Sequence, residues 1–425
     1  MKSFARSTDS RSDTSPSRPI TNTKFDIIII GTGIAGLYSA YKIQKQFPDV
    51  SVLLLERNPK NEIGGRAGNV TFQNTTVVTG AGIGRKEKDK LLMNLLKELD
   101  IPFGEFQTGP HYSETIQPIC NLKKTFLFLK KEYRRIEDGD KTFQEYATTL
   151  LEKDEYKHFI TCSGYTDYEK EDAYEVLYNY GFNDNYDEWT GISIPWKKLV
   201  DELRKHSNIC ASTNVKKIQY VENEGYKIHV ENGDIFKCKK VIVATTVGSV
   251  LKIVPGASSA NSIYRKIHGQ PFIRVYGKFS KKCMPIVEKH IPTSIVVPGP
   301  IHRIIPMDPA KGVYMIAYTD NRGAITVNKY AKNKEHLCRL LEISLGIEKN
   351  SLQLDAIIDF YWEEGTHYYD PLPIQYKTRK EFIKIAQNPM NNMLVVGEMI
   401  SLNQGWVEGA LESVDAVVTK KWIST

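Results

Sequence analysis

Three glycines near the start of the chain are spaced so that they could hold a dinucleotide. Gly31, Gly33 and Gly36 form the pattern G-x-G-x-x-G. In this pattern the first glycine permits a tight turn, the second lets a pyrophosphate approach the backbone, and the third lets a helix pack close to a strand. Glu56 follows about 20 residues after the motif, where a carboxylate can accept hydrogen bonds from a ribose. The spacing therefore predicts an adenine dinucleotide site.

The residues around these groups predict the elements that must position them. The apolar run at residues 25–30 is too short for a helix and predicts a buried strand. Residues 37–47 predict a helix, and residues 50–55 predict a second strand that leads into Glu56. The phosphates would then lie at the N-terminus of the helix, where free N–H groups favour an anion. Strand, helix, strand and acid in register favour a dinucleotide site over a merely structural glycine turn.

The glycine motif alone does not distinguish a nicotinamide from a flavin cofactor, but later segments do. Gly64-Gly65-Arg66 comes shortly after Glu56, and the chain closes with a strand-like run at residues 393–396, Gly397-Glu398, and residues 404–413. In this order the motifs resemble the flavin-containing amine oxidase family, which includes monoamine, polyamine and L-amino acid oxidases. The resemblance covers both ends of the chain and part of its middle, about half of its length.

The resemblance implies an FAD cofactor and a set of residues that bind it. The helix that begins at Val407 would direct its N-terminus toward the flavin and stabilise negative charge on the reduced ring. No cysteine lies close to Gly365 or Gly405, so we expect FAD to be bound non-covalently. The expected cofactor-binding residues are Gly31, Gly33, Ile34, Ala35, Gly36, Glu56, Arg57, Gly64, Gly65, Arg66, Gly82, Ile83, Gly84, Val215, Gly397, Glu398, Gly405, Trp406 and Val407.

The same resemblance implies the catalytic residues. Relatives flank the substrate nitrogen with two aromatic walls; Trp406 matches one wall, and the other falls on His367 or Tyr368. A structural hydrogen-bonding role is the alternative for His367. Arg274 stands where many relatives have a lysine, and it could hold a substrate carboxylate or indicate weak oxidase activity. Arg85, at the end of a second glycine turn, either faces the cofactor or substrate or lies on the surface.

The implied activity is an FAD-dependent oxidation of an amine or amino acid. A hydride passes from the carbon next to nitrogen to the flavin, the imine hydrolyses, and molecular oxygen gives hydrogen peroxide. One alternative is another FAD enzyme on the same scaffold, such as a desaturase, a protoporphyrinogen oxidase-like enzyme or a sugar mutase. Another is a catalytically silent flavoprotein with a binding or virion-structural role, because residues 80–85 and 365–371 resemble homologues from large DNA viruses.

The expected fold is α/β, with a discontinuous Rossmann-like FAD-binding domain and an inserted substrate domain. The substrate domain combines a helical block, preceded by a short strand at residues 125–129, with a mixed β-sheet. Helices are predicted within the block at residues 142–151, 155–162 and 171–180. The expected boundaries are a disordered tail at 1–24, FAD-binding parts at 25–110, 191–260 and 385–425, the helical block at 111–190, and the sheet at 261–384.

Composition sets limits on partners and location. The chain has 425 residues, and 41% hydrophobic and 25% charged residues are ordinary globular values. A net charge of +7 does not require a nucleic-acid partner, and no apolar run is long enough to span a membrane. The six cysteines lack metal-ligand spacing, so we expect reduced thiols, no metal, and a cytoplasmic or, for a viral protein, virion-associated location. The sequence leaves the substrate and the oligomeric state open.

Overall fold

A seven-stranded sheet forms the centre of the computed structural model, which describes residues 24–424. Its core is parallel: β1 pairs with β2 on one side and with β11 on the other. The far edge of β11 pairs with β10 along its first part and with β17 along its last part. The strands are β8 (Ile209–Cys210), β2 (Val52–Leu55), β1 (Lys24–Ile30), β11 (Ile235–Val243), β10 (Gly225–Val230), β9 (Val215–Val221) and β17 (Met393–Val395).

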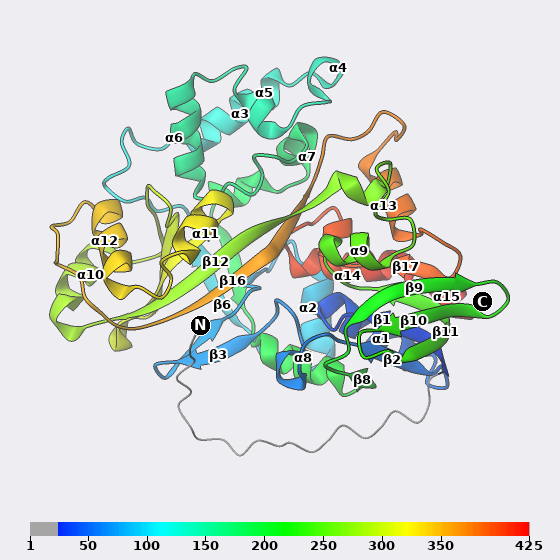
Figure 1. Cartoon of the computed structure of the whole chain (residues 1–425). Coiled ribbons are helices and arrows are strands. Elements are labelled where there is room, and N and C mark those ends of the chain that lie inside the picture. Colours follow the sequence, from blue (N-terminus) through cyan, green and yellow to red (C-terminus); the bar gives the residue numbers. More distant parts are fainter. Residues whose placement is uncertain (1–23, 425) are drawn as a thin grey trace.

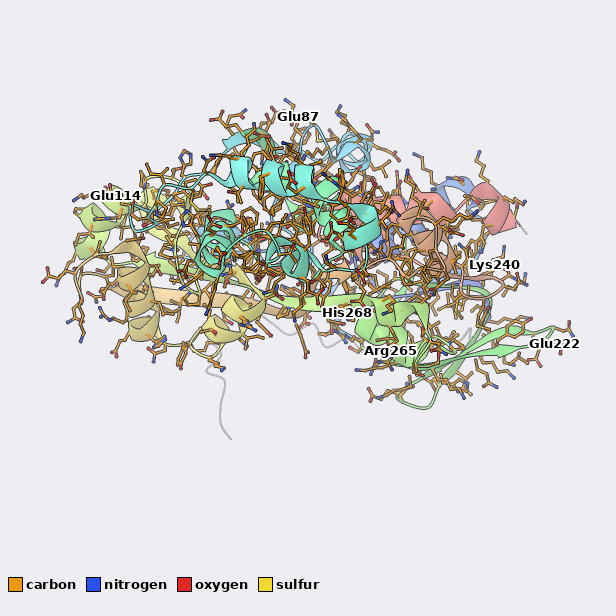
Figure 2. The ribbon with its side chains drawn as sticks, turned by 90° about the horizontal axis from the view of Figure 1, so that it is seen from above. Glu87, Glu114, Glu222, Lys240, Arg265 and His268 are labelled. Atoms are coloured by element: carbon orange, nitrogen blue, oxygen red, sulfur yellow. A yellow bond between two sulfur atoms is a disulfide. The ribbon has the colours of Figure 1, made fainter. Side chains whose placement is uncertain are left out.

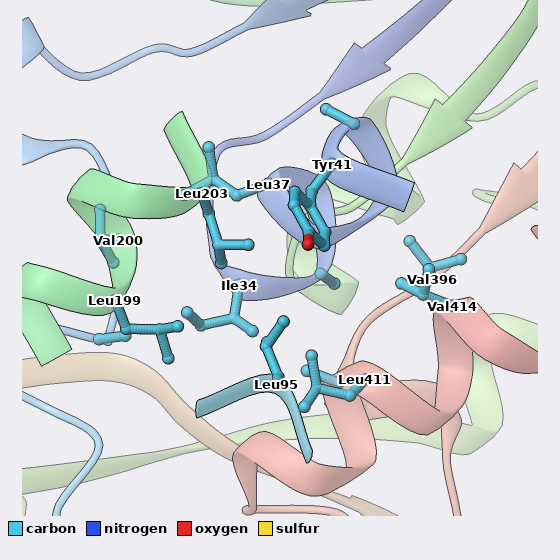
Figure 3. Packing of buried hydrophobic residues seen from close by; sticks show 14 of the residues in the cluster. Ile34, Leu37, Tyr41, Leu95, Leu199, Val200, Leu203, Val396, Leu411 and Val414 are labelled. Carbon is cyan, nitrogen blue, oxygen red and sulfur yellow. The ribbon is translucent and has the colours of Figure 1, made fainter. Parts of the chain in front are cut away.

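Both faces of this sheet are buried, as expected for parallel strands between helices. Along β1, Ile27 and Ile29 enter one apolar core, whereas Ile28 and Ile30 enter the core on the opposite face. Figure 3 shows the first core, in which side chains of four helices meet. These helices are α1 (Ile34–Gln46), α2 (Lys90–Glu98), α8 (Trp196–Arg204) and α14 (Val407–Val417); α9 (Val247–Ile253) and α13 (Arg379–Gln387) pack into the second core, and α15 (Lys420–Ser424) ends the chain.

A second, antiparallel sheet carries the residues expected near the substrate. Its long strands β12 and β16 pair from Ile267 opposite Tyr369 to Phe279 opposite Leu354, and they cross most of the molecule (Figure 1). Helices α10 (Met284–His290), α11 (Asn321–Asn328) and α12 (Lys334–Leu345) share a core with this sheet. The strand order is β13 (Ile295–Val296), β14 (Arg303–Asp308), β15 (Val313–Asp320), β12 (Ile267–Phe279) and β16 (Leu354–Tyr369).

The helical block lies beside the second sheet and has an aromatic core. Stacked and tilted rings of Phe126, Phe143, Phe159 and Phe182 fill its centre. In Figure 1 the block stands at the top of the molecule. Its helices are α3 (Leu122–Glu132), α4 (Arg135–Asp138), α5 (Phe143–Ala147), α6 (Lys153–Ser163) and α7 (Ala173–Tyr178).

Two small sheets and several loops complete the fold. The turn residues Glu114 and Glu222 lie at opposite ends of the molecule in Figure 2, which shows an elongated outline. Among residues 24–424, no helix is both long enough and apolar enough to cross a bilayer. The small sheets are the hairpin β3 (Asn69–Phe72) with β4 (Thr75–Val78), and β5 (Gly84–Arg85), β7 (Trp189–Ser193) and β6 (Gly104–Thr108).

The fold confirms the expected α/β class and corrects one element. Residues 125–129 do not form a strand but belong to α3. The buried residues Leu122, Phe126 and Leu129 recur at the spacing of a helix face, and this period outweighs the strand preference of the aromatic residues. Apart from Lys24, the strands of the seven-stranded sheet come from the three proposed FAD-binding parts, and the division into domains stays a proposal. The proposed tail lies outside the described residues apart from Lys24.

The prediction of six reduced cysteines is also wrong for one pair. Cys120 and Cys162 form a disulfide between the start of α3 and the end of α6. The other four cysteines are free, and three of them are buried. The pairing depends on two segments 42 residues apart meeting in the folded block. Linear spacing alone carries no signal for such a contact.

Candidate active site

One large cavity of about 1980 Å³ connects the two sheets. It opens at the carboxyl ends of β1, β2 and β11, where Gly31, Glu56 and Ala244 line it. Ligands of open α/β sheets bind at this edge of the strands. The opposite end of the cavity is lined by the second sheet and by the loop that precedes α14. A single elongated ligand could therefore extend from the glycine motif to the substrate side.

The glycine motif leaves space where a phosphate would need it. Gly31 has a φ of +103°, which favours glycine, and a Cβ on Gly36 would lie 2.1 Å from the carbonyl oxygen of Gly31. A Cβ on Gly33, by contrast, would meet nothing within 4 Å, because this residue faces the cavity. Helix α1 begins at Ile34 without a side-chain cap, so its first N–H groups are available to an anion. These residues fit a bound pyrophosphate.

Glu56 lies in a fixed orientation at the end of the cavity that the glycine motif lines. We call this the nucleotide end. Its Oε2 accepts hydrogen bonds from the backbone N–H and the hydroxyl of Thr32, at 3.0 and 2.6 Å. Its Oε1 accepts a hydrogen bond from the N–H of Asn58 at 2.9 Å. Arg57 and Val215 line the same end. The carboxylate is thus held at the cavity wall, and its expected contact with a ribose stays a prediction.

Arg66 connects the first glycine segments with the C-terminal part of the chain. Its guanidinium donates to the carbonyl oxygen of Gly365 at 2.8 Å and forms an ion pair with Glu398 at 3.0 Å. His367 Nδ1 donates to the same carboxylate at 2.8 Å. Burial disfavours the charged form of Glu398, but the Arg66 charge and the His367 hydrogen bond hold its pKa well below the usual range. This network joins three segments that are distant in sequence.

Arg274 reaches the cavity from β12. Its Nε donates to the carbonyl oxygen of Gly80 at 2.9 Å, and its guanidinium lies 4.0 Å from the ring centroid of Tyr318. A Cβ on Gly82 would lie 2.8 Å from the Arg274 Nη2, so glycine is needed for this close approach. The side chain is buried. The structure therefore places a fixed, permanent positive charge beside the second glycine turn.

Trp406 lines the cavity directly before α14, and Arg85 covers one face of its ring. The Arg85 guanidinium lies 3.9 Å from the ring centroid of Trp406. Asp89 and Asp184 hold this guanidinium, with an Nε to Oδ1 distance of 2.8 Å for Asp89. Burial raises the pKa of Asp89, and the charge of Arg85 partly offsets that rise. Arg85 is thus neither a surface residue nor part of the cavity lining, because it lies behind Trp406.

His367 and Tyr368 do not line the main cavity. His367 is buried between Glu398 and the N–H of Val247, which donates to its Nε2 at 3.4 Å. Tyr368 stacks on His268, with ring centroids 5.1 Å apart. The part of β16 that lines the main cavity is the continuous run from Trp362 to Thr366, which ends directly before His367. The hydrogen bonds of His367 fit the structural alternative, but His367 also lines a small second pocket together with Thr366 and Gly405. The expected second wall at position 367 or 368 therefore stays a prediction.

The other expected cofactor-binding residues mostly meet in this one cavity. Gly36 and Gly84 do not line it, and a Cβ on either would collide with packed neighbours. The expected residues that line the cavity are Gly31, Gly33, Ile34, Ala35, Glu56, Arg57, Gly64, Gly65, Arg66, Gly82, Ile83, Arg274, Val215, Gly397, Glu398, Gly405, Trp406 and Val407.

The sequence did not predict a pair of acids at the end of the cavity that the second sheet lines. We call this the substrate end. Asp167 and Asp320 both line the cavity, and the hydroxyl of Tyr180 donates to Asp167 at 2.7 Å. Burial and the nearby Asp320 raise the pKa of Asp167 to about 7, although the Tyr180 hydrogen bond opposes this shift. Asp320 accepts from the N–H of Thr166 at 3.0 Å. Isolated acids in a loop and at a strand end carry no motif that could have revealed them.

Comparisons with known proteins agree with this geometry. The family model described as flavin containing amine oxidoreductase matches residues 129–416, and that of an NAD(P)-binding Rossmann-like domain matches residues 29–99. A structure of a putrescine oxidase double mutant with redesigned cofactor binding superposes with a TM-score of 0.72. It is 13% identical and covers 95% of this chain and 100% of its own, so it shows a shared fold.

A similar protein of unknown role comes from a giant virus. An uncharacterized protein of Acanthamoeba polyphaga mimivirus is 21% identical, over 98% of this chain and 97% of its own length. The family match spans more than half of the chain and includes Arg274, Glu398 and Trp406. The glycine motif, the second sheet and α14 all contribute residues to the one large cavity. The chain belongs to the flavin containing amine oxidoreductase family.

Proposed function

We propose that the chain binds one FAD non-covalently and oxidises a small amine or amino acid with molecular oxygen as final acceptor. The observation that carries this proposal is the single cavity that runs from the glycine motif to Trp406 and Arg274. When bound, the flavin supplies a two-electron acceptor for the hydride on the carbon next to nitrogen. The expected products are an imine, which water hydrolyses, and hydrogen peroxide.

Different residues of the chain would bind different parts of FAD. The N–H groups at the start of α1 would bind the pyrophosphate, and Glu56 would accept from the adenosine ribose. Arg66 and Glu398 would hold the middle of the cofactor, since both line the cavity and fix each other. Helix α14 begins at the cavity without a side-chain cap, so its N-terminus favours negative charge there.

The substrate end carries both signs of charge. An aliphatic amine has a pKa of about 10.4, so it is a cation in neutral water before it enters the cavity. Asp167, with a pKa raised to about 7, is able to hold a proton at neutral pH, and Tyr180 fixes its orientation. Arg274 offers a cation to a carboxylate. The arrangement suits an amine or a zwitterionic amino acid better than an uncharged apolar molecule.

Anaerobic bleaching of the bound flavin tests the activity. The flavin-loaded protein is mixed without oxygen with a panel of mono-, di- and polyamines and L-amino acids, and its visible absorbance is followed. We expect one class to bleach the flavin, and the same class to release hydrogen peroxide in air. If Arg274 binds the substrate carboxylate, the Arg274→Met variant should lose bleaching by amino acids. Unchanged bleaching would assign Arg274 to another role.

A catalytically silent flavoprotein is the second candidate, and one observation favours it. The positions expected to form the second aromatic wall, His367 and Tyr368, lie outside the cavity. A protein that retains its yellow colour with every compound, but bleaches with dithionite, would support this candidate. Such a result would show a reducible flavin without an amine substrate.

A further inference from the structure

We propose that Cys120, Cys162 and His158 form a reversible thiol–disulfide exchange site whose disulfide holds two walls of the main cavity together. The two sulfurs are bonded, and His158 Nε2 lies 3.4 Å from Cys162 Sγ. His158 and Cys162 are four residues apart on α6, so they share one face of that helix. The inference does not depend on the oxidation of any substrate by the flavin.

Cys162 leads directly into one wall of the cavity. It lies in the last turn of α6, which ends at Gly164 with a φ of +66°. Ser163 donates to the carbonyl oxygen of Tyr165 and accepts from the hydroxyl of Tyr168, at 2.8 and 2.7 Å. Tyr165 and Asp167 then line the cavity. The position of the end of α6 therefore determines where these wall residues lie.

Cys120 belongs to the segment that forms a neighbouring wall. Residues 109–111, upstream of Cys120 in the same loop, line the cavity. The backbone of this loop is hydrogen-bonded to β13, through Val296 N–H to the His111 carbonyl at 2.8 Å and Ser113 N–H to the Val296 carbonyl at 2.9 Å. The disulfide thus ties the segment after His111 to the segment that carries Tyr165. Opening the bond would remove this covalent tie and leave the two segments joined only through their non-covalent contacts with β13.

The surroundings of the sulfurs suit attack by an external thiol. Cys120 is half-buried, whereas Cys162 is 1% exposed, so an incoming thiolate reaches the Cys120 Sγ. The attack forms a mixed disulfide with Cys120 and breaks the bond to Cys162, which leaves as a thiolate beside His158. A hydrogen bond from the nearby His158 ring to the Cys162 sulfur would stabilise the thiolate, and a better-stabilised leaving group departs faster.

A dithiol reductant completes the exchange. Its second thiol loses its proton and displaces Cys120 from the mixed disulfide. The reductant leaves as its own disulfide, having given up two electrons, and the two protons of its thiols end on Cys120 and Cys162. The same three side chains, with ligand atoms all within 4.8 Å of one another, could instead hold a soft metal ion if the thiols were reduced. The bonded sulfurs favour the disulfide, and metal binding is an outcome of the test.

Alkylation mapping of the intact protein, purified in air with its flavin, tests the exchange. Iodoacetamide and peptide mass spectrometry are expected to label Cys120 and Cys162 only after treatment with dithiothreitol. Removal of dithiothreitol and addition of oxidised glutathione should restore protection. Labelling of both cysteines without reductant, or a stoichiometric zinc ion lost in the Cys162→Ser variant, would overturn the proposal.

Two further measurements test the role of His158 and the link to the cavity. His158→Gln is expected to slow reduction about threefold or more, whereas His336→Gln, whose ring stacks on Tyr330, should not change the rate. Amide hydrogen exchange in residues 163–168 should rise on reduction, and exchange in residues 25–30 should not. Equal rates in the two histidine variants, or unchanged exchange in residues 163–168, would contradict the proposal.

Discussion

The two ends of the cavity are built in different ways. At the nucleotide end, backbone groups do most of the positioning: Gly31 and Gly36 allow close approach, and Gly33 faces open space. At the substrate end, charged side chains from distant segments do it, with Arg85 held by Asp89 behind Trp406. Backbone geometry is fixed by local sequence, whereas side-chain clusters depend on the whole fold. Substitutions at the nucleotide end are therefore expected to be more damaging than substitutions at the substrate end.

The largest expected effect comes from adding a methyl group at the nucleotide end. Gly36→Ala places a Cβ 2.1 Å from the Gly31 carbonyl oxygen, and neither backbone can move easily. We expect loss of bound flavin and a fall in the free energy of unfolding on the order of 5 kcal/mol. Gly33→Ala is the matched control: it has room for its Cβ, so it should keep the fold and lose only the flavin. Urea unfolding and visible absorbance measure both; equal stability loss in the two variants would break the comparison.

The next largest effect is expected behind Trp406. Arg85→Met leaves the buried Asp89 carboxylate without its partner, which costs about 3 to 5 kcal/mol when such pairs are broken. The neighbouring Lys86 pairs with Glu105 in an exposed position, and Lys86→Met should change stability little. Both are measured by denaturant unfolding. A small effect of Arg85→Met would show that this ion pair does not organise the substrate end.

The stability contributed by the substrate end is expected to depend on pH through Asp167. The pKa of Asp167 is raised to about 7 in the folded chain, whereas the pKa of an aspartate in an unfolded chain is about 3.9. The folded state therefore binds this proton more tightly, and stability from this group is lost as pH rises from about 4 through 7. Asp167→Asn should be more stable than the parent at pH 8 by on the order of 2 to 4 kcal/mol, and alike at pH 4. Stability curves at several pH values check this, and a parallel pH dependence in both proteins would refute it.

The smallest effect is expected at Tyr368. This residue stacks on His268 outside the cavity, so Tyr368→Phe should leave the flavin absorbance and its affinity unchanged. Trp406→Leu is the contrasting variant, because Trp406 lines the cavity and should alter the flavin spectrum. Titration of the apoprotein with FAD measures both. A spectral change in the Tyr368 variant would restore that residue to the site.

The sequence predicted the nucleotide end well because local rules govern it. The glycine spacing, the short apolar strand at residues 25–30 and the helix after it were each visible, and β1 and α1 have the expected order. Glu56 and Trp406 also lie in one cavity, as the resemblance implied. These features depend on spacing along the chain, which a single sequence records.

The substrate end was predicted less well, since its features depend on which segments meet. The stretch of β16 that lines the cavity ends at Thr366, and this limit depends on where β16, paired with β12, passes the other walls of the cavity. The Asp167 and Asp320 pair and the Cys120–Cys162 disulfide each join residues from different elements. The strand predicted at residues 125–129 is part of α3 instead, because the aromatic residues there suit both structures.

The amount and attachment of flavin test the central claim most directly. The chain is purified from flavin-replete cells, denatured, and its released chromophore is identified and quantified by mass spectrometry. We predict one FAD per chain, released without breaking a covalent bond, and none in the Gly33→Ala variant. A colourless parent protein that takes up no added FAD would contradict a cofactor extended from Glu56 to Trp406.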